Sequence, residues 1–374
     1  MKILFVNNNL NGLVHFRLDL MLYLQNHGHD IVAVLPFSEE NQLGLNGIRV
    51  LYVPLRPSST DIFYDISFFF SLLKVFKKEK PGYAFLYTIK PNIYGTIAAH
   101  WCGVSSSMMM AGLGYAFTSD CLSYRIARML YRISLKKTKH LLLLNEKDEK
   151  TVLELGLCKP EKIILLKAGE GVNLLRFQFH DNTSDKVCFL FVGRLLREKG
   201  VLDFVDAARM VKKEFPDAEV QLAGSTDPDS PGHLTPNEMK DIESSGIVEF
   251  LGRIDMVKKM DEPGIILVLP SYYPEGMNRS LMEGCASGKP IITTMLPGCR
   301  EAVDDGKNGY LVPPRQPDIL AKSMLHYLKL PEEARKRMSE ASRRIAEQRF
   351  DVRNVYRVYE DILMENNMKA EAGN

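Results

Sequence analysis

Residues 265–283, which read IILVLPSYYPEGMNRSLME, contain the pattern that decides the fold. Five consecutive apolar residues, a turn bounded by prolines and a helical pattern predict a strand, a turn and a helix in direct succession. A strand that is apolar at every position is buried on both faces, as in a parallel sheet covered by helices. Asn278 or Ser280 can cap the predicted helix, and three unbonded amides at its start would then form a site for an anion or a hydroxyl group.

The alternation of strand and helix extends from this stretch over the whole chain. Strands are expected at 2–6, 30–36, 48–54, 83–89, 107–111, 140–144 and 162–167, and then at 187–192, 219–223, 248–251, 265–269, 290–294 and 310–312. Helices are expected at 13–26, 63–78, 93–101, 121–135, 146–155, 201–215, 236–244, 280–286, 319–328, 332–349 and 352–366. Strands separated by helices in this way predict parallel sheets with helices on both faces.

A polar stretch at 179–186 divides this alternation into two halves. We therefore predict an α/β protein with two facing Rossmann-like domains, at 1–173 and 174–350, which also fits the length of 374 residues. The helix at about 351–366 is expected to pack back on the first domain, and 367–374 to form a disordered tail. Right-handed crossovers bring the loops after the strands of each sheet to one edge, where ligands bind.

The overall composition is that of a soluble globular protein, with 45% hydrophobic and 25% charged residues. A net charge of +2 gives no reason to expect a nucleic-acid partner. Six scattered cysteines without a Cys-x-x-Cys pair indicate a reducing compartment and no metal site. The apolar run at 2–6 predicts a strand and no signal peptide, and the most apolar window, 62–76, is too short to span a membrane. We therefore expect a cytoplasmic protein.

A second motif, FVGRLLREKG at 191–200, follows the first strand of the second domain. Gly193 permits close approach of a ligand, Arg194 offers two parallel donors and Lys199 offers a compact charge, so that the two cations can clamp a diphosphate. Alternatively, these are the charges of a solvated turn. That interpretation explains the intervening charged residues well, but it explains Arg194 at the strand end less easily.

Two glutamates, Glu275 and Glu283, flank the start of the helix in the opening stretch. Glu275 lies beside the predicted anion site, and Glu283 lies on a helix face that can reach a ribose. Two glutamates at this spacing are common by chance, and they can instead serve the helix dipole or an exposed face. Their place in a strand–turn–helix unit favours the functional interpretation.

The pattern G-R-x4-K-G followed by E-G-x6-E resembles that of retaining glycosyltransferase family 4, whose members have the GT-B fold. Stretches at 251–253, 286–292, 302–303 and 305–312 also match the family, so that the resemblance covers nearly the whole chain. It is specific for the family but says little about the sugar. Within the family, the chain looks most like N-acetylhexosaminyltransferases that act on polyprenyl-diphosphate-linked glycans.

The resemblance implies a donor site in the second domain. Arg194 and Lys199 would neutralise the diphosphate of a UDP-sugar, Glu275 would contact the sugar hydroxyls, and Glu283 would bind the ribose. The other donor-binding residues that it implies are Gly12, Gly193, Arg253, Gly276, Met277 and Asn278. Because the cations and amides take the role of a divalent ion, no metal and no cofactor are expected. The one literal D-x-D, Asp227-Pro228-Asp229, is interpreted as a turn.

In the first domain the resemblance implies an acceptor side. Its candidate residues are Asn9, Asn11, His15, Arg17, Lys90, Gly112 and Gly114. His15 can equally be a helix residue with local partners. Many family members have a histidine where this sequence has Ile89, so that Lys90 becomes the polar candidate at that place.

Basic residues without acidic neighbours are concentrated at 121–139, among apolar residues at helical spacing. The residues predicted to face a membrane are Arg125, Arg128, Arg132, Lys136 and Lys137. A second basic amphipathic pattern lies at 63–80. Helices of this kind lie on anionic membrane surfaces. Alternatively, the apolar residues belong to the core and the cations are merely solvated.

These observations predict a retaining glycosyltransferase that moves a sugar, an N-acetylhexosamine, from a UDP-sugar to a lipid-linked glycan precursor in capsule, O-antigen or glycoprotein synthesis. The enzyme is expected to be peripheral on the cytoplasmic face of the membrane. The alternatives are a transferase with a soluble acceptor, a non-catalytic nucleotide-sugar-binding protein and a nucleotide-sugar epimerase.

Overall fold

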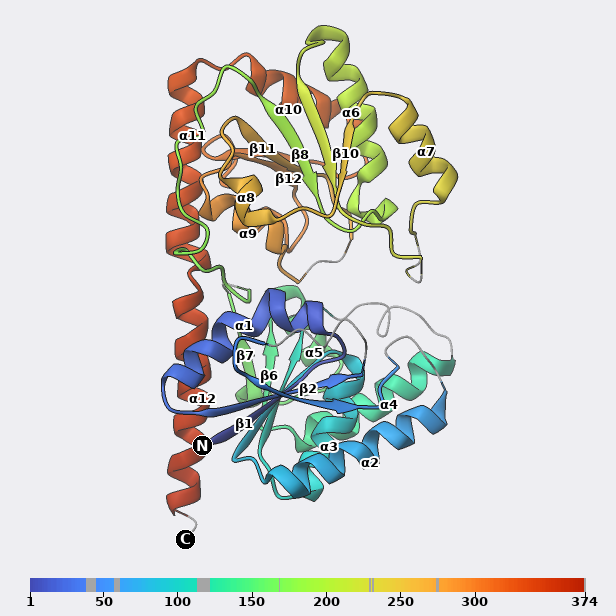
Figure 1. Cartoon of the computed structure of the whole chain (residues 1–374), viewed down its shortest axis with the longest axis vertical. Coiled ribbons are helices and arrows are strands. Elements are labelled where there is room, and N and C mark those ends of the chain that lie inside the picture. Colours follow the sequence, from blue (N-terminus) through green and yellow to red (C-terminus); the bar gives the residue numbers. More distant parts are fainter. Residues whose placement is uncertain are drawn as a thin grey trace. The chain divides into compact units, whose positions relative to one another are not determined.

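The computed structural model describes residues 1–37, 45–56, 61–112, 122–167, 169–228, 230, 232–273 and 276–372, without the side chains of 122–125 and 369–372. The chain forms two compact units (Figure 1). The first unit contains Met1–Glu170 and Arg353–Asn374, and the second contains Gly171–Val352. Each unit is built around a parallel sheet of its own, which confirms the predicted α/β class.

The sheet of the first unit has seven parallel strands in the order β3-β2-β1-β4-β5-β6-β7. They are β1 (Lys2–Val6), β2 (Asp30–Pro36), β3 (Arg49–Val53), β4 (Tyr83–Tyr87), β5 (Ser106–Met110), β6 (His140–Leu143) and β7 (Ile163–Leu165). The helices between them are α1 (Leu10–Asn26), α2 (Ile62–Glu79), α3 (Thr96–Trp101), α4 (Leu122–Lys137) and α5 (Glu146–Glu154). The strand order reverses between β1 and β4, and at such a point the loops that follow the two strands leave a crevice for ligands.

The sheet of the second unit has six parallel strands in the order β10-β9-β8-β11-β12-β13. They are β8 (Cys188–Val192), β9 (Glu219–Ala223), β10 (Glu249–Gly252), β11 (Ile265–Leu269), β12 (Ile291–Thr294) and β13 (Gly309–Val312). The helices are α6 (Val201–Glu214), α7 (Pro236–Ser244), α8 (Met256–Met260), α9 (Arg279–Ala286), α10 (Pro317–Leu328) and α11 (Glu332–Ile345). Here the strand order reverses between β8 and β11, so that the crevice of this sheet lies where these two strands end.

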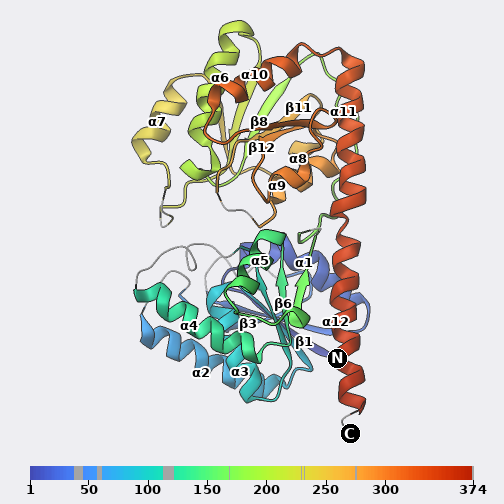
Figure 2. The same ribbon diagram turned by 180° about the vertical axis from the view of Figure 1, so that it is seen from behind.

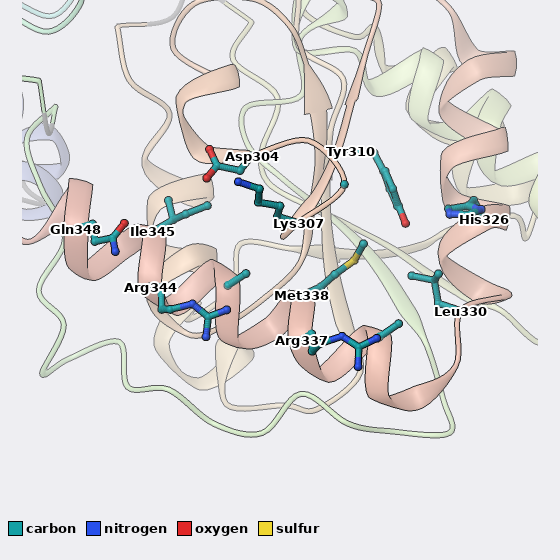
Figure 3. A pocket seen from close by; sticks show the side chains of 13 residues that line it. Asp304, Lys307, Tyr310, His326, Leu330, Arg337, Met338, Arg344, Ile345 and Gln348 are labelled. Atoms are coloured by element: carbon teal, nitrogen blue, oxygen red, sulfur yellow. The ribbon is translucent and has the colours of Figure 1, made fainter.

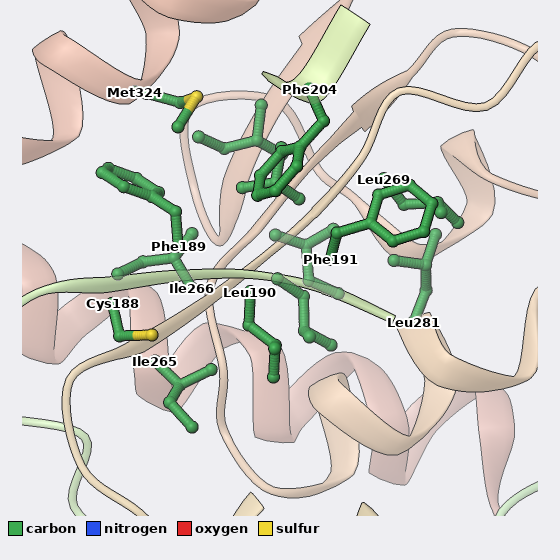
Figure 4. Close-up of a cluster of buried hydrophobic side chains, with 14 of the residues drawn as sticks. Cys188, Phe189, Leu190, Phe191, Phe204, Ile265, Ile266, Leu269, Leu281 and Met324 are labelled. Atoms are coloured by element: carbon green, nitrogen blue, oxygen red, sulfur yellow. The ribbon is translucent and has the colours of Figure 1, made fainter. Parts of the chain in front are cut away.

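Helices cover both faces of the second sheet. Right-handed crossovers put α6 and α7 on one face and α9 on the other. α10 packs on α6, and α11 packs on α9. The core beneath α6 is aromatic: Figure 4 shows Phe189 and Phe191 of β8 close to Phe204 of α6, and the ring centroids of Phe191 and Phe204 are 5.7 Å apart. This packing fixes the ends of β8 and β11, which carry the candidate site.

The C-terminal helix, α12 (Val352–Ala372), belongs to the first unit from Arg353 onward. Tyr356 stacks on Tyr23 of α1 at 4.2 Å between ring centroids, and the hydroxyl groups of Tyr359 and Tyr87 are 3.0 Å apart in the core. α12 continues to Ala372, so the expected helix end at 366 and disordered tail from 367 are corrected. Its last residues, Lys369 to Ala372, are good helix formers, and for that reason they prolong the helix.

Two further differences from the expectation, a strand boundary and an additional helix, have local causes. β4 ends at Tyr87, since Thr88 has a left-handed φ of 72° and its carbonyl accepts the N–H of Asn92 in the following helical turn. The short helix α8 is missing from the sequence-based prediction. Asp255 caps it by accepting hydrogen bonds from the N–H groups of Val257 and Lys258, and an aspartate before a short helical run is the signal that predicts such a cap.

A fully buried lysine, Lys289, lies just before β12. Its Nζ donates to Oδ1 of Asn182 at 2.8 Å and to the carbonyl of Glu262 at 2.7 Å. Burial lowers the pKa of Lys289 from 10.5 to about 8, because the interior disfavours the charged form. Below pH 8 the folded protein therefore carries the full cost of this buried charge.

We expect the stability of the protein to rise with pH between about 8 and 10.5 relative to a Lys289→Met variant. In this window the folded state releases the Lys289 proton while the unfolded state keeps it, which gives a slope of up to about 1.4 kcal/mol per pH unit. The measurement is chemical denaturation of both proteins at pH 7 to 10. Lys322→Met, at an exposed position on α10, is the control. Parallel pH profiles for Lys289→Met and the unmodified protein would contradict the assignment.

Candidate functional site

The carboxyl edge of the second sheet brings two predicted donor-binding cations together at the reversal of strand order. Arg194 follows β8, and Lys199 ends a single 3₁₀ turn, Arg197–Lys199. The turn after β11 carries Tyr273, whose ring centroid lies 5.8 Å from Cζ of Arg194 and 5.4 Å from Nζ of Lys199. Both cations therefore lie beside one aromatic ring, and Lys199 is only 7% exposed.

Two glycines let backbone segments pass close to one another at this edge of the sheet. Gly200 has a φ of 78°, and a Cβ at this position would overlap the carbonyl of Pro270 at the end of β11. Gly224, with a φ of 149°, passes so close to Gly193 that a Cβ would overlap the Gly193 carbonyl. Neither Gly224 nor Tyr273 is among the residues that the sequence predicts for the site. A glycine or an aromatic residue just after a buried strand is the signal that could have identified them.

Arg194 has polar neighbours in the loop after β9. Its Nη1 is 3.5 Å from Oδ2 of Asp227 and 3.4 Å from Oγ of Ser230. Asp227 is the first residue of the D-x-D, and it accepts from Ser230 as well, whereas Asp229 lies outside the described residues. In the part of the chain that the structure describes, no group of three or more His, Cys, Asp or Glu residues is placed to hold a metal ion.

The start of α9 offers fewer amides than expected. Asn278 is the cap, and its Oδ1 accepts the N–H of Leu281 at 3.3 Å. The amide of Asn278 itself donates to the carbonyl of Gly298 at 2.9 Å, so the prediction that this amide holds the donor sugar is wrong. The bond to Gly298 joins residues 20 positions apart, and no local pattern indicates it. Gly276 is buried and Met277 half-buried beside the cap, while Glu275 lies outside the described residues.

Glu283 lies inside α9 and is largely buried. Its Oε1 accepts from Nε of Arg279, one turn earlier, at 2.8 Å. Only 12% of the Glu283 side chain and 14% of the Arg279 side chain are exposed. A carboxylate held in this way presents a fixed acceptor on α9, the helix that follows β11.

Two hollows lie on the second unit. One, of about 600 Å³, is lined by the loops after β9 and β10 and by α7, and it includes the predicted Arg253. It lies at the same edge of the sheet as Arg194. The other, of about 550 Å³, lies at the amino end of β13 between the loop 304–310, α10 and α11, as Figure 3 shows, and none of the predicted site residues lines it.

The first predicted acceptor loop is shorter than expected. Asn9 caps α1 by accepting the N–H of Gly12, so Asn11 and Gly12 belong to the first helical turn and not to a loop. A Cβ at Gly12 would lie 2.9 Å from Oδ1 of Asn9, which explains the glycine there by the cap. His15 is exposed on the next turn.

Arg17 is buried in the core of the first unit, and its predicted role as an acceptor contact is corrected. Its Nη2 donates to Oε1 of Glu170 at 2.8 Å, its Nη1 donates to the carbonyl of Gly12 at 3.0 Å, and its guanidinium lies 4.2 Å from the centroid of the Tyr87 ring. Only 6% of its side chain is exposed. The guanidinium therefore joins α1 to Glu170, the last residue of the first of the unit's two segments.

Lys90 is likewise held by other groups. Its Nζ donates to Oδ1 of Asp65 at 2.6 Å and to the carbonyl of Arg56 at 2.9 Å. Burial and the Asp65 carboxylate raise the pKa of Tyr94, whose hydroxyl donates to Oδ2 of Asp65. The side chain that is half-exposed after β4 is Ile89. Gly112 has a left-handed φ of 128°, and Gly114 lies outside the described residues.

The predicted membrane-facing residues lie on α4, and the helices α2, α3 and α4 are neighbours in the first unit (Figure 2). Arg132, Lys136 and Lys137 are exposed on α4 and Arg128 is half-buried, while the side chain of Arg125 lies outside the described residues. Large apolar side chains are exposed on the same helices: Ile62, Phe63, Ile66 and Phe70 on α2, Trp101 on α3, and Ile126, Met129 and Ile133 on α4. We call this the α2–α4 surface. Among the described residues, no helix combines the length and the apolar character that crossing a membrane requires.

Two family models match the chain. The model described as glycosyl transferases group 1 matches residues 175–345, and the model described as glycosyl transferase 4-like matches residues 2–145. The chain belongs to glycosyltransferase family 4. The enzyme is a glycosyltransferase of the hexosyltransferase type, which confirms the enzyme class predicted from the sequence.

Relatives and solved structures agree with this assignment. N,N'-diacetylbacillosaminyl-diphospho-undecaprenol alpha-1,3-N-acetylgalactosaminyltransferase of Campylobacter jejuni is 28% identical over 329 residues, which are 83% of this chain and 84% of the relative. UDP-Gal:alpha-D-GlcNAc-diphosphoundecaprenol alpha-1,3-galactosyltransferase of Escherichia coli is 25% identical, over 71% of each chain.

Among solved structures, a glycosyltransferase from Rickettsia africae matches with a TM-score of 0.79 and 20% identity over 98% of both chains. HepE of Anabaena in complex with UDP and glucose matches with a TM-score of 0.79 and 16% identity, over 98% of this chain and 100% of HepE. These structures show the fold of the family 4 enzyme, which is GT-B.

Proposed function

We propose that this glycosyltransferase moves an N-acetylhexosamine from a UDP-sugar to a polyprenyl-diphosphate-linked glycan, with retention of the anomeric configuration. The observation that carries the proposal is the pairing of Arg194 and Lys199 beside Tyr273 at the reversal of strand order. The names of the Campylobacter and Escherichia relatives support the lipid-linked acceptor, and the first of them supports the N-acetylhexosamine.

The donor site follows from the charge of the leaving group. A nucleoside diphosphate gains negative charge as the glycosidic bond breaks, and fixed cations stabilise that charge most in the transition state. Arg194 and Lys199 supply two cations at one sheet edge. Glu283 supplies an acceptor for the ribose hydroxyls, Glu275 contacts the hydroxyls of the sugar, and the hollow at Arg253 accommodates the base.

The acceptor side follows from the α2–α4 surface. Exposed aromatic and aliphatic side chains insert between lipids, and exposed cations next to them attract anionic headgroups. A lipid-linked diphosphate is reached most directly by an enzyme that lies on the membrane. We therefore place the enzyme at the cytoplasmic face, as a peripheral protein.

The proposed site needs no divalent metal, because cations of the protein oppose the diphosphate charge. With a UDP-N-acetylhexosamine and a polyprenyl-diphosphate-linked sugar, we expect the same initial rate of transfer in excess EDTA as in buffer with manganese. The measurement is chromatographic separation of the lipid-linked product at several times. A rate that EDTA abolishes and manganese restores would contradict the metal-independent site and make Asp227 a candidate metal ligand.

A further inference from the structure

Arg279, the first residue of α9, joins two groups that lie far apart in the sequence. Its Nε donates to Oε1 of Glu283 at 2.8 Å, and its Nη1 donates to the carbonyl oxygen of Gly171 at 2.6 Å. The pair of Arg279 and Glu283 adds little to the stability of the helix itself. A cation at the first position opposes the helix dipole, and an arginine that precedes its glutamate by four residues is the less favourable order of such a pair. The position of Arg279 therefore calls for another explanation.

The Gly171 carbonyl is a fixed anchor. Gly171 has a left-handed φ of 70°, and a Cβ there would lie 2.6 Å from Cα of Val352. The next residue, Val172, donates its N–H to the carbonyl of Phe350 at 2.7 Å and accepts the N–H of Val352 at 3.1 Å. Two hydrogen bonds from Val172 to the segment 350–352 thus fix the backbone next to this carbonyl.

Arg279 transmits that fixed position to Glu283. A glutamate side chain on a helix has three rotatable bonds, and in water it adopts many rotamers. The planar guanidinium restricts it, since Nε fixes one carboxylate oxygen while Nη1 is held by the backbone on its other side. Both side chains are largely buried, so water competes little for these bonds.

We propose that Arg279 is the positioning residue of the ribose contact: it holds the Glu283 carboxylate in the orientation that accepts the two ribose hydroxyls of the nucleotide. This inference rests on the proposed function, in which Glu283 binds the ribose. Arg279 acts through Glu283 and does not contact the nucleotide. Its effect is therefore specific to the 2′- and 3′-hydroxyl groups.

The test compares the affinity of UDP with that of 2′,3′-dideoxy-UDP by titration calorimetry. Hydrogen bonds to a carboxylate predict that the unmodified enzyme binds UDP about 10- to 100-fold more tightly than the dideoxy analogue. In Glu283→Gln this ratio should fall toward one. In Arg279→Met it should fall about tenfold, while the Kd of the dideoxy analogue changes less than about twofold.

Arg343 of α11 provides a matched control. Its Nε donates to Oε1 of Glu347, also four residues later and at 2.8 Å, and its Nη1 donates to the backbone carbonyls of Phe177 and Ala286. Arg343→Met should lower the melting temperature about as much as Arg279→Met does, but it should leave the UDP ratio unchanged. A second variant, Arg279→Lys, keeps the charge but cannot span both partners, and we expect an intermediate ratio.

Three outcomes would overturn the inference. If Arg279→Met weakens UDP and dideoxy-UDP equally, Arg279 has a structural role only. A second outcome is that Arg279→Met shows the same preference for UDP over dideoxy-UDP as the unmodified enzyme, while Glu283→Gln shows no preference. In that case Arg279 does not position Glu283, and the ribose contact of Glu283 stands. If the unmodified enzyme binds both nucleotides equally, the ribose contact of Glu283 is itself wrong, and the positioning role falls with it.

Discussion

Replacing Lys199 with methionine should reduce the rate of sugar transfer about 100- to 1,000-fold, the loss observed when one preorganised donor is removed from a developing negative charge. Methionine keeps much of the side-chain volume in a position that is only 7% exposed, so packing around Gly200 and Pro270 is retained. The loss should lie mainly in kcat, because the charge on the leaving diphosphate is greatest in the transition state. The measurement is steady-state transfer at varied UDP-sugar.

Lys259 of α8 is a matched control for this substitution. It is also a buried lysine, 9% exposed, and its Nζ pairs with Glu262 away from the ends of β8 and β11. Lys259→Met removes one buried cation as well, and we expect it to keep the kcat of the unmodified enzyme. An unchanged kcat in Lys199→Met, with both variants folded, would remove Lys199 from the donor site.

Reversing three exposed cations of the α2–α4 surface should abolish most binding to anionic membranes. In a variant with Arg132, Lys136 and Lys137 replaced by glutamate, we expect the partition coefficient onto vesicles with one-third anionic lipid to fall at least about 100-fold. Each basic residue near such a surface contributes about 1 kcal/mol, so three contribute about 3 kcal/mol before any repulsion from the new glutamates. Sedimentation with the vesicles measures this partition.

The control reverses three exposed cations on α11, Lys336, Arg337 and Arg344, and thus changes the net charge by the same amount in the other unit. This variant should bind vesicles like the unmodified protein. High salt should weaken binding of the unmodified protein, because it screens exposed charges. Binding that is absent, or that is equally weakened in both variants, would contradict a role of the α2–α4 surface and favour a soluble acceptor.

Most strands were predictable because they are short runs rich in apolar residues that are separated by helical patterns. β1, β2, β9 and β11 begin and end where the sequence analysis puts them. The rule that parallel strands end at one edge was enough to expect Arg194 and Lys199 near the turn after β11. It required no knowledge of side-chain geometry, since strand order and crossover handedness determine which loops meet.

The contacts that the sequence could not predict are those between distant buried polar groups. From the sequence, Arg17 is predicted to be an exposed helix residue, because arginine is seldom buried without a partner. The partner that permits its burial, Glu170, lies 153 positions later in the chain. The ion pair of Lys90 with Asp65 and the bond from Asn278 to Gly298 are hidden for the same reason. Such pairings depend on tertiary packing, and no local pattern encodes them.

Product analysis tests whether the enzyme transfers a sugar from a UDP-sugar to a lipid-linked acceptor with retention of configuration. The enzyme is incubated with a UDP-N-acetylhexosamine and a short-chain polyprenyl-diphosphate-linked sugar, and the lipid-linked product is examined by mass spectrometry and proton NMR. We expect an acceptor that is heavier by one N-acetylhexosamine joined in the α configuration, as in the donor. A β-linked product, or consumption of the UDP-sugar by hydrolysis without any change in the acceptor, would contradict it.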